Sequence, residues 1–177
     1  MADYLLDTHI VAYWYDTSRL EHAKVQSRLN AVKQPDPVAK YVPRLFVSII
    51  TLGEIAYGHR VAPAPDAAKQ AEYTRFVREQ FPEVLEMTDD VAEQYGELRA
   101  WLFNNCGPTA RKSKVKRAEE LVSPTTGREL GIDENDIWIV AQAKTHNFVL
   151  VTHDSRGNFG KLLKQFAPDL TVEDWTL

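Results

Sequence analysis

Short apolar runs recur along the chain and mark the strands of a predicted sheet. Tyr4–Leu6, Leu45–Val47 and Phe148–Val151 are continuously apolar, which is typical of strands buried on both faces. Val84–Met87 and Leu170–Val172 are weaker candidates, and we expect the second of these to be an edge strand. Buried strands of this kind favour parallel pairing in the middle of a sheet.

The segments between these runs have the composition and N-terminal signals of helices. Ser48, Asp66 and Thr88 can each cap a helix, because their side-chain oxygens accept hydrogen bonds from free backbone N–H groups. The expected helices are Thr8–Tyr15, Leu20–Val32, Ser48 to about Arg60, Asp66 to about Phe81, Thr88 to about Phe103 and Asp133–Thr145. Strands that alternate with helices predict an α/β fold, with helices on both faces of a mostly parallel sheet of about four or five strands.

One stretch, residues 104–131, interrupts this alternation and is interpreted as an insertion in a single domain that spans residues 1–177. It contains loop-forming Gly and Pro residues, and we expect one short helix around Val115–Leu121. It also carries a dense run of positive charge. The run comprises Arg111, Lys112, Lys114, Lys116 and Arg117. Two interpretations stay open: a solvated face, since Glu119 and Glu120 follow, or a surface that contacts phosphates.

Composition narrows the class of protein. The chain has 177 residues, of which 44% are hydrophobic and 26% are charged, so it can bury a sizeable core. Its net charge of −4 excludes a uniformly basic surface for nucleic acid, although a local basic patch remains possible. The single cysteine, Cys106, excludes an internal disulfide and a cysteine-based zinc site. With no signal peptide and no apolar run long enough to span a bilayer, we expect a cytoplasmic protein without membrane contact.

Acidic residues fall where the predicted topology brings distant segments together. Asp7 and Asp154 follow two of the buried strands, and the carboxyl ends of parallel strands share one edge of the sheet. The crossover helices begin at the same edge, so Asp136, in the first turn of one helix, and Glu54, about two turns into another, return to it. Four carboxylates from distant parts of the chain are therefore expected to converge.

A divalent cation would stabilise such a cluster. The helix that carries Asp136 continues as Ile137–Ala141 and is apolar all round, so it should be buried, where an unpaired carboxylate is costly. Clustered carboxylates also repel one another. Their oxygens suit Mg²⁺ or Mn²⁺. Each acid alone has a simpler interpretation as a cap or turn residue, and Asp133 fits the cap of this helix well.

Other chemistry-bearing residues have a structural interpretation. Trp138 and Trp101 are expected in the core and not as platforms on which bases stack. His153 and His9 are expected to point away from the acidic site, and the histidines show no spacing typical of a metal site. Cys106 has no partner that would activate it as a nucleophile.

Four ordered segments that contain the acids resemble the PIN-domain ribonucleases, in particular the VapC-type toxins of toxin–antitoxin pairs. They are Leu5–Thr8, Ser48–Glu54, Asn135–Ala141 and Val151–Asp154, and Asn158-Phe159 follows them. The resemblance extends from Leu5 to about Phe159. It implies a PIN-like α/β/α sandwich. The insertion is longer and more basic than such a domain needs.

The resemblance also implies a metal-dependent ribonuclease with Asp7, Glu54, Asp136 and Asp154 as its acidic cluster. Asp7, Asp136 and Asp154 are the expected metal ligands, and Glu54 either ligates or orients water. The supporting polar groups are Thr8, Asn135, Thr152 and the capping residue Asp133. Related toxins commonly form homodimers and are held inactive by an antitoxin, here a VapB-like partner.

Two alternatives remain at this point. One is a PIN-like module that binds RNA or a protein without cutting. The other is a phosphatase of the haloacid-dehalogenase type with Asp7 as its nucleophile. That chemistry requires an acid two residues further on, where this chain has His9.

Overall fold

The computed structural model describes residues 3–34, 38, 41–106, 117–123, 127–153 and 158–177. Within these residues, five parallel strands form one sheet in the order β3-β2-β1-β4-β5. The strands are β1 (Tyr4–Leu6), β2 (Leu45–Ser48), β3 (Val84–Leu85), β4 (Val149–Val151) and β5 (Val172–Glu173). The predicted α/β class and parallel sheet are therefore confirmed, with β5 at an edge as expected.

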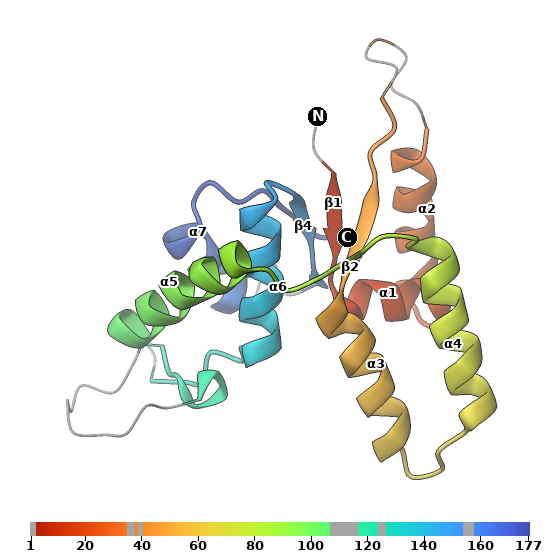
Figure 1. Ribbon diagram of the computed structural model, residues 1–177, viewed down its shortest axis with the longest axis horizontal. Coiled ribbons are helices and arrows are strands. Elements are labelled where there is room, and N and C mark those ends of the chain that lie inside the picture. Colours follow the sequence, from red (N-terminus) through yellow and green to blue (C-terminus); the bar gives the residue numbers. More distant parts are fainter. Residues whose placement is uncertain (1–2, 35–37, 39–40, 107–116, 124–126, 154–157) are drawn as a thin grey trace.

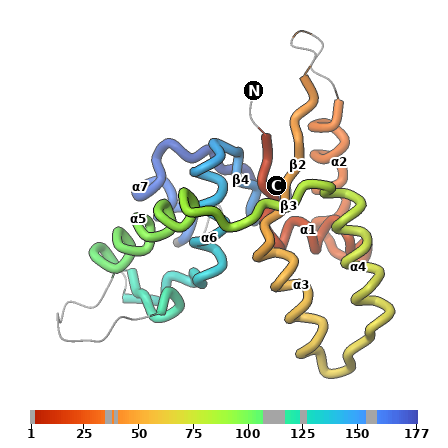
Figure 2. The backbone as a smooth tube through the Cα atoms, viewed as in Figure 1, coloured from red at the N-terminus to blue at the C-terminus, as the bar shows by residue number. Residues whose placement is uncertain are grey.

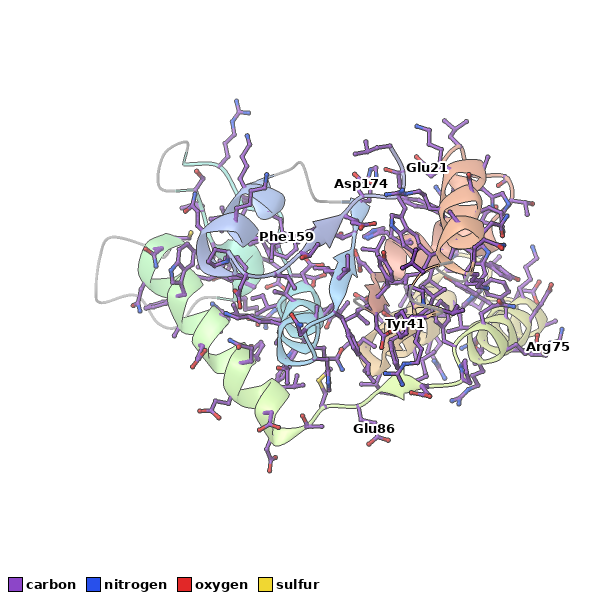
Figure 3. The ribbon with its side chains drawn as sticks, turned by 90° about the horizontal axis from the view of Figure 1, so that it is seen from above. Glu21, Tyr41, Arg75, Glu86, Phe159 and Asp174 are labelled. Carbon is purple, nitrogen blue, oxygen red and sulfur yellow. The ribbon has the colours of Figure 1, made fainter. Side chains whose placement is uncertain are left out.

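Helices cover both faces of the sheet. One layer contains α1 (Thr8–Tyr15), α2 (His22–Val32), α3 (Ile49–Val61) and α4 (Ala67–Gln80). The other contains α5 (Asp89–Cys106), α6 (Glu134–Thr145) and α7 (Asn158–Phe166), with a short 3₁₀ helix, η1 (Ala118–Glu120). Figure 1 shows the strands between these two groups, and Figure 2 shows the chain crossing from α4 through β3 to α5. Seen from above, Arg75 and Glu86 project from the periphery (Figure 3).

The strand register assigns each apolar side chain to one of two cores. Leu5 pairs with Phe46 and Leu150, and all three pack against the layer of α5, α6 and α7. The next residue along β1, Leu6, pairs with neighbours that pack against the opposite layer. Successive side chains of a strand point to opposite faces, so continuous apolar runs are what a sheet covered on both sides requires.

Several elements differ from the sequence-based prediction, most clearly α5, η1 and α7. Helix α5 continues to Cys106, into the segment taken as the insertion, because Leu98, Leu102 and Cys106 extend one buried face. The expected short helix is the single 3₁₀ turn η1, of which Ala118 is fully buried. Helix α7 was not predicted at all. Within the described residues, no helix is long and apolar enough to cross a membrane.

Candidate active site

The first residues of three helices meet at the carboxyl ends of the central strands. Asp7 directly follows β1 and caps α1, while Ser48 ends β2 and caps α3. Helix α6 is capped by Asp133 and begins at the same end of the sheet (Figure 1). The convergence follows from parallel strands joined by antiparallel crossover helices, as the sequence predicts.

Asp7 is 6% exposed, and its carboxylate accepts hydrogen bonds from the first residue of α1 and from the residue that follows β4. Its Oδ1 accepts a hydrogen bond from the Thr8 backbone N–H at 2.6 Å, and its Oδ2 accepts one from the Thr152 hydroxyl at 2.9 Å. Thr152 follows β4, so this bond joins the ends of the two central strands. His9 Nδ1 lies 3.7 Å from the same Oδ2. The Asp7 carboxylate is therefore fixed in one orientation.

Glu54 is bound from two other helices. The Thr8 hydroxyl at the start of α1 donates to Glu54 Oε2, and it lies 3.0 Å from the Thr51 hydroxyl. The Asn135 amide at the start of α6 donates to Glu54 Oε1 at 2.9 Å. Glu54 thus joins α1, α3 and α6. A carboxylate has about four lone-pair sites, so accepting these two bonds leaves capacity for a water or a substrate hydroxyl.

Asp136 takes part in the capping of its own helix. Its backbone N–H donates to Asp133 Oδ1 at 2.9 Å, while its Oδ2 accepts from the Asp133 backbone N–H at 2.9 Å. This reciprocal arrangement is a capping box, and it satisfies two backbone donors at the helix start. Asp133 therefore has the capping role that the sequence predicts, and Asp136 shares it.

Asp7 and Asp136 line one small cavity of about 10 Å³ together with Thr152. Its remaining walls are apolar and come from α6, β4 and α7; they are Ile139, Val140, Leu150 and Phe159. Phe159 lies on the side of α7 that faces the sheet (Figure 3). Two carboxylates from distant parts of the chain thus face one space of about the size of a water molecule.

The start of α6 is anchored to α5 through Glu134. The Tyr95 hydroxyl donates to Glu134 Oε2 at 2.7 Å, and Arg99 Nε donates to Oε1 at 2.9 Å. Burial and the hydrogen bond to Glu134 raise the pKa of Tyr95. The Ala118 backbone N–H also donates to Oε1, at 3.2 Å, which ties η1 to the same carboxylate. These bonds set the position of the residues that follow, Asn135 and Asp136.

Most of the predicted site residues meet at this edge of the sheet. The contacts above bring together Asp7, Thr8, Glu54, Asp133, Asn135, Asp136 and Thr152. Asp154 lies outside the described residues, as do Arg111, Lys112, Lys114 and Lys116. Arg117 is described and exposed. In the described part of the chain, no group of three or more His, Cys, Asp or Glu side chains is placed to hold a metal ion.

The structure corrects one expectation and adds residues that the sequence analysis missed. His153 points away as expected, with its Nδ1 2.8 Å from the Thr176 hydroxyl, but His9 lies beside Asp7. Thr51 and Glu134 were not identified. Thr51 precedes Glu54 by three residues, which places both on one face of α3, so helical spacing was a usable signal. The partners of Glu134 are distant in sequence, so no local pattern could have identified this residue.

The comparisons with known proteins assign the family. The family model described as the PIN domain matches residues 4–162, so the chain belongs to the PIN-domain family. No curated protein sequence matches it significantly. The predicted resemblance to PIN-domain proteins is therefore confirmed at the level of the family.

Solved structures with the same fold come from VapBC complexes. A chain of VapBC-1 from nontypeable Haemophilus influenzae is 22% identical, with a TM-score of 0.64 over 98% of this chain and 98% of that one. VapBC2 from Rickettsia felis, solved with a DNA fragment from their promoter, is 20% identical, with a TM-score of 0.63 over 97% and 98%. VapBC-5 from Mycobacterium tuberculosis, a member of the VapBC family of toxin–antitoxin systems, is 22% identical, with a TM-score of 0.53 over 98% and 98%.

Proposed function

We propose that this protein is a metal-dependent ribonuclease and the toxin of a toxin–antitoxin pair. The observation that carries the proposal is the shared cavity of Asp7 and Asp136, with Glu54 tied to both neighbouring helix starts through Thr8 and Asn135. PIN-family membership and the fold shared with VapBC chains support it. Nothing in the family assignment supports the phosphatase alternative.

The donor set fits Mg²⁺ or Mn²⁺. Mg²⁺ is commonly bound through one or two carboxylates, with waters and substrate phosphates completing the shell, and a closed cage of protein ligands is not needed. Asp7 and Asp136 supply two carboxylates on one cavity. We assign both as ligands, with Asp154 as the third. When bound, the metal supplies a Lewis acid that offsets charge on the scissile phosphate and makes water a stronger nucleophile.

The protein side chains have distinct roles in this proposal. Thr152 fixes the orientation of the Asp7 carboxylate, and Asp133 holds the backbone that presents Asp136. Glu54 does not line the cavity of the two aspartates, so we assign it to orienting the attacking water. Thr8 and Asn135 would fix the orientation of the Glu54 carboxylate for that task. Such supporting hydrogen bonds commonly matter as much as the ligands themselves.

RNA and an antitoxin are the proposed binding partners. We assign the basic run, Arg111 to Arg117, to contacts with the RNA backbone, because charge attracts phosphates without reading sequence. By analogy with the VapBC complexes, a VapB-like antitoxin would inhibit the site, and the toxin would act as a homodimer. Purification from the native host should then recover a small bound protein whose removal raises ribonuclease activity; recovery of a fully active, unpartnered protein would contradict this part.

A chelation experiment tests the enzyme against the non-catalytic alternative. The purified protein is incubated with RNA in Mg²⁺, in Mn²⁺, in excess EDTA, and in EDTA followed by either metal. The proposal predicts cleavage only with metal and recovery when metal is restored. Binding of RNA without any cleavage under all four conditions would favour a binding module. If the protein cleaves RNA as fast in EDTA as with metal, it is a ribonuclease that does not depend on metal.

A further inference from the structure

A second pocket lies among α1, α3 and α4, three helices of one layer (Figure 1). Its volume is about 470 Å³, which is within the range of small-molecule sites in proteins. Buried Tyr73 forms its floor, and exposed Arg19 and Glu72 lie at its rim. Among the described residues that line it, none borders the cavity of Asp7 and Asp136. The residues that define it, called the tyrosine pocket below, are Tyr15, Asp16, Arg19, His59, Glu72 and Tyr73.

The floor of the tyrosine pocket holds a hydroxyl with no partner. Tyr73 is only 8% exposed, yet its hydroxyl makes no hydrogen bond within the described part of the chain. Tyr95, which also lies in a stacked aromatic pair, instead donates its hydroxyl to Glu134 at 2.7 Å. Burial raises the pKa of Tyr73, and its neighbours Tyr15 and Asp16 add to the effect, so the hydroxyl keeps its proton at neutral pH. A buried hydroxyl without a partner costs free energy, which a ligand that bonds to it would recover.

The side chains around this hydroxyl carry more negative than positive charge. Asp16 accepts hydrogen bonds from the backbone N–H and the hydroxyl of Ser18, and it pairs with Arg19 Nε at 3.3 Å. Glu72 is exposed and forms neither a salt bridge nor a hydrogen bond within the described residues. Its charge reaches the pocket, because burial and then Glu72 raise the pKa of Tyr15. One arginine therefore faces two carboxylates, which favours a cationic ligand.

The walls of the tyrosine pocket are aromatic. Tyr15 and Tyr73 stack with ring centroids 4.2 Å apart and an angle of 16° between their planes. The His59 ring stands edge-on to Tyr73, with its centroid 5.9 Å away. Aromatic faces attract organic cations, and a planar guanidinium also stacks on them. Rings next to carboxylate and hydroxyl oxygens therefore suit a ligand that has both N–H donors and positive charge.

We propose that the tyrosine pocket binds a small organic cation, a guanidinium or ammonium compound, whose charged group pairs with Glu72 and donates a hydrogen bond to the Tyr73 hydroxyl. The exposed side chains at the rim, Arg19 and Glu72, change rotamer rapidly, so an entering ligand can displace them and reach the floor. Because the tyrosine pocket shares no residue with the acidic cavity, this site and the proposed nuclease can fail separately.

The test uses four probes that share a butyl chain and differ in their charge: butylguanidinium, butylammonium, butanol and butyrate. Each is titrated into the protein while the NMR signals of backbone amides in α1, α3 and α4 are followed. Tyr73→Phe removes only the hydroxyl, and Glu72→Gln removes only the charge. The control is Glu79→Gln, the same change about two helical turns further along α4 and outside the tyrosine pocket. Urea unfolding checks each variant, and Tyr73→Phe should be at least as stable as the wild type, because its hydroxyl has no hydrogen bond to lose.

We expect saturable binding of both cations at the tyrosine pocket and no saturable binding of butanol or butyrate. Tyr73→Phe should raise the Kd of the cations about tenfold and Glu72→Gln about threefold, while Glu79→Gln should stay within about twofold of the wild type. No saturable binding of either cation, equally tight binding of butanol or butyrate, or unchanged affinity in both Tyr73→Phe and Glu72→Gln would overturn the proposal.

Discussion

Asp136 combines a structural role with a proposed chemical one. Its Oδ2 completes the capping box with Asp133, and its side chain lines the cavity that it shares with Asp7. From sequence, capping and metal binding looked like competing interpretations of an acid at a helix start. The structure makes them compatible, because capping fixes the orientation that a ligand needs.

At the residue scale, Thr8→Val tests whether the hydrogen bonds to Glu54 matter for catalysis. Valine keeps the volume but removes the hydroxyl that donates to Glu54 and meets Thr51. We expect cleavage to fall about 10- to 100-fold, as for other groups that orient catalytic side chains. Initial rates of RNA cleavage measure this.

The matched control for that variant is Thr17→Val, at an exposed position beyond the end of α1. It makes the same chemical change away from the site and should leave the rate unchanged. A Thr8→Val protein as active as this control would show that Glu54 needs no donor from α1.

At the scale of elements, the sequence predicted helices that have both a cap and a buried face. Helix α6 is the clearest example, with Asp133 as the cap and with Ile137 and all residues from Ile139 to Ala143 buried. Helix α7 was missed although its apolar residues recur with helical spacing. They are Phe159, Leu162, Leu163 and Phe166, and all are buried. Gly160 lowers the helix propensity of this segment, and burial of the apolar face outweighs that effect.

The anchor of α6 on α5 gives an element-scale prediction. Glu134→Gln keeps the shape of the side chain but removes the ion pair with Arg99, whose N···O distance is 2.9 Å. We expect the free energy of unfolding to fall by about 1–2 kcal/mol, a modest value because the pair reaches solvent. Cleavage should fall as well, because Glu134 anchors the start of α6 and so positions the next two residues, Asn135 and Asp136, at the candidate site.

Urea unfolding and cleavage rates measure both effects. The control is Glu97→Gln on the exposed face of α5, which should change stability by less than about 0.5 kcal/mol. If Glu134→Gln loses stability yet cleaves at the wild-type rate, the anchor supports the fold without positioning the site.

At the scale of the whole molecule, the alternation of strands and helices predicted the parallel sheet, and this topology is what brings Asp7, Glu54 and Asp136 to one edge. Contacts that depend on packing could not be predicted. Nothing in the sequence around His9 indicates that its ring lies beside Asp7, and the partners of Glu134 are 16, 35 and 39 residues away. The extension of α5 to Cys106 likewise depends on a core that forms only in the folded chain.

Net charge gives the whole-molecule prediction. An acidic protein must still attract RNA, and the basic run is its densest positive segment. Changing Arg111, Lys112, Lys114, Lys116 and Arg117 together to Ser should raise the Kd for RNA and flatten its dependence on salt, because fewer counterions are released. The rate at saturating RNA should change much less. Unchanged affinity and salt slope would identify the run as a solvated face.

The central claim is that Asp136 belongs to a metal site that cuts RNA, and Asp136→Asn tests it most directly. Asparagine keeps the side-chain shape and can still accept the capping bond, so the fold should survive. The control is Asp66→Asn, the same change at the cap of α4, away from the cavity. Titration with Mn²⁺ and an RNA cleavage assay are run on both variants and the wild type. We expect weakened metal binding and no cleavage in Asp136→Asn alone; wild-type metal binding and cleavage in that variant would show that Asp136 is not part of the metal site.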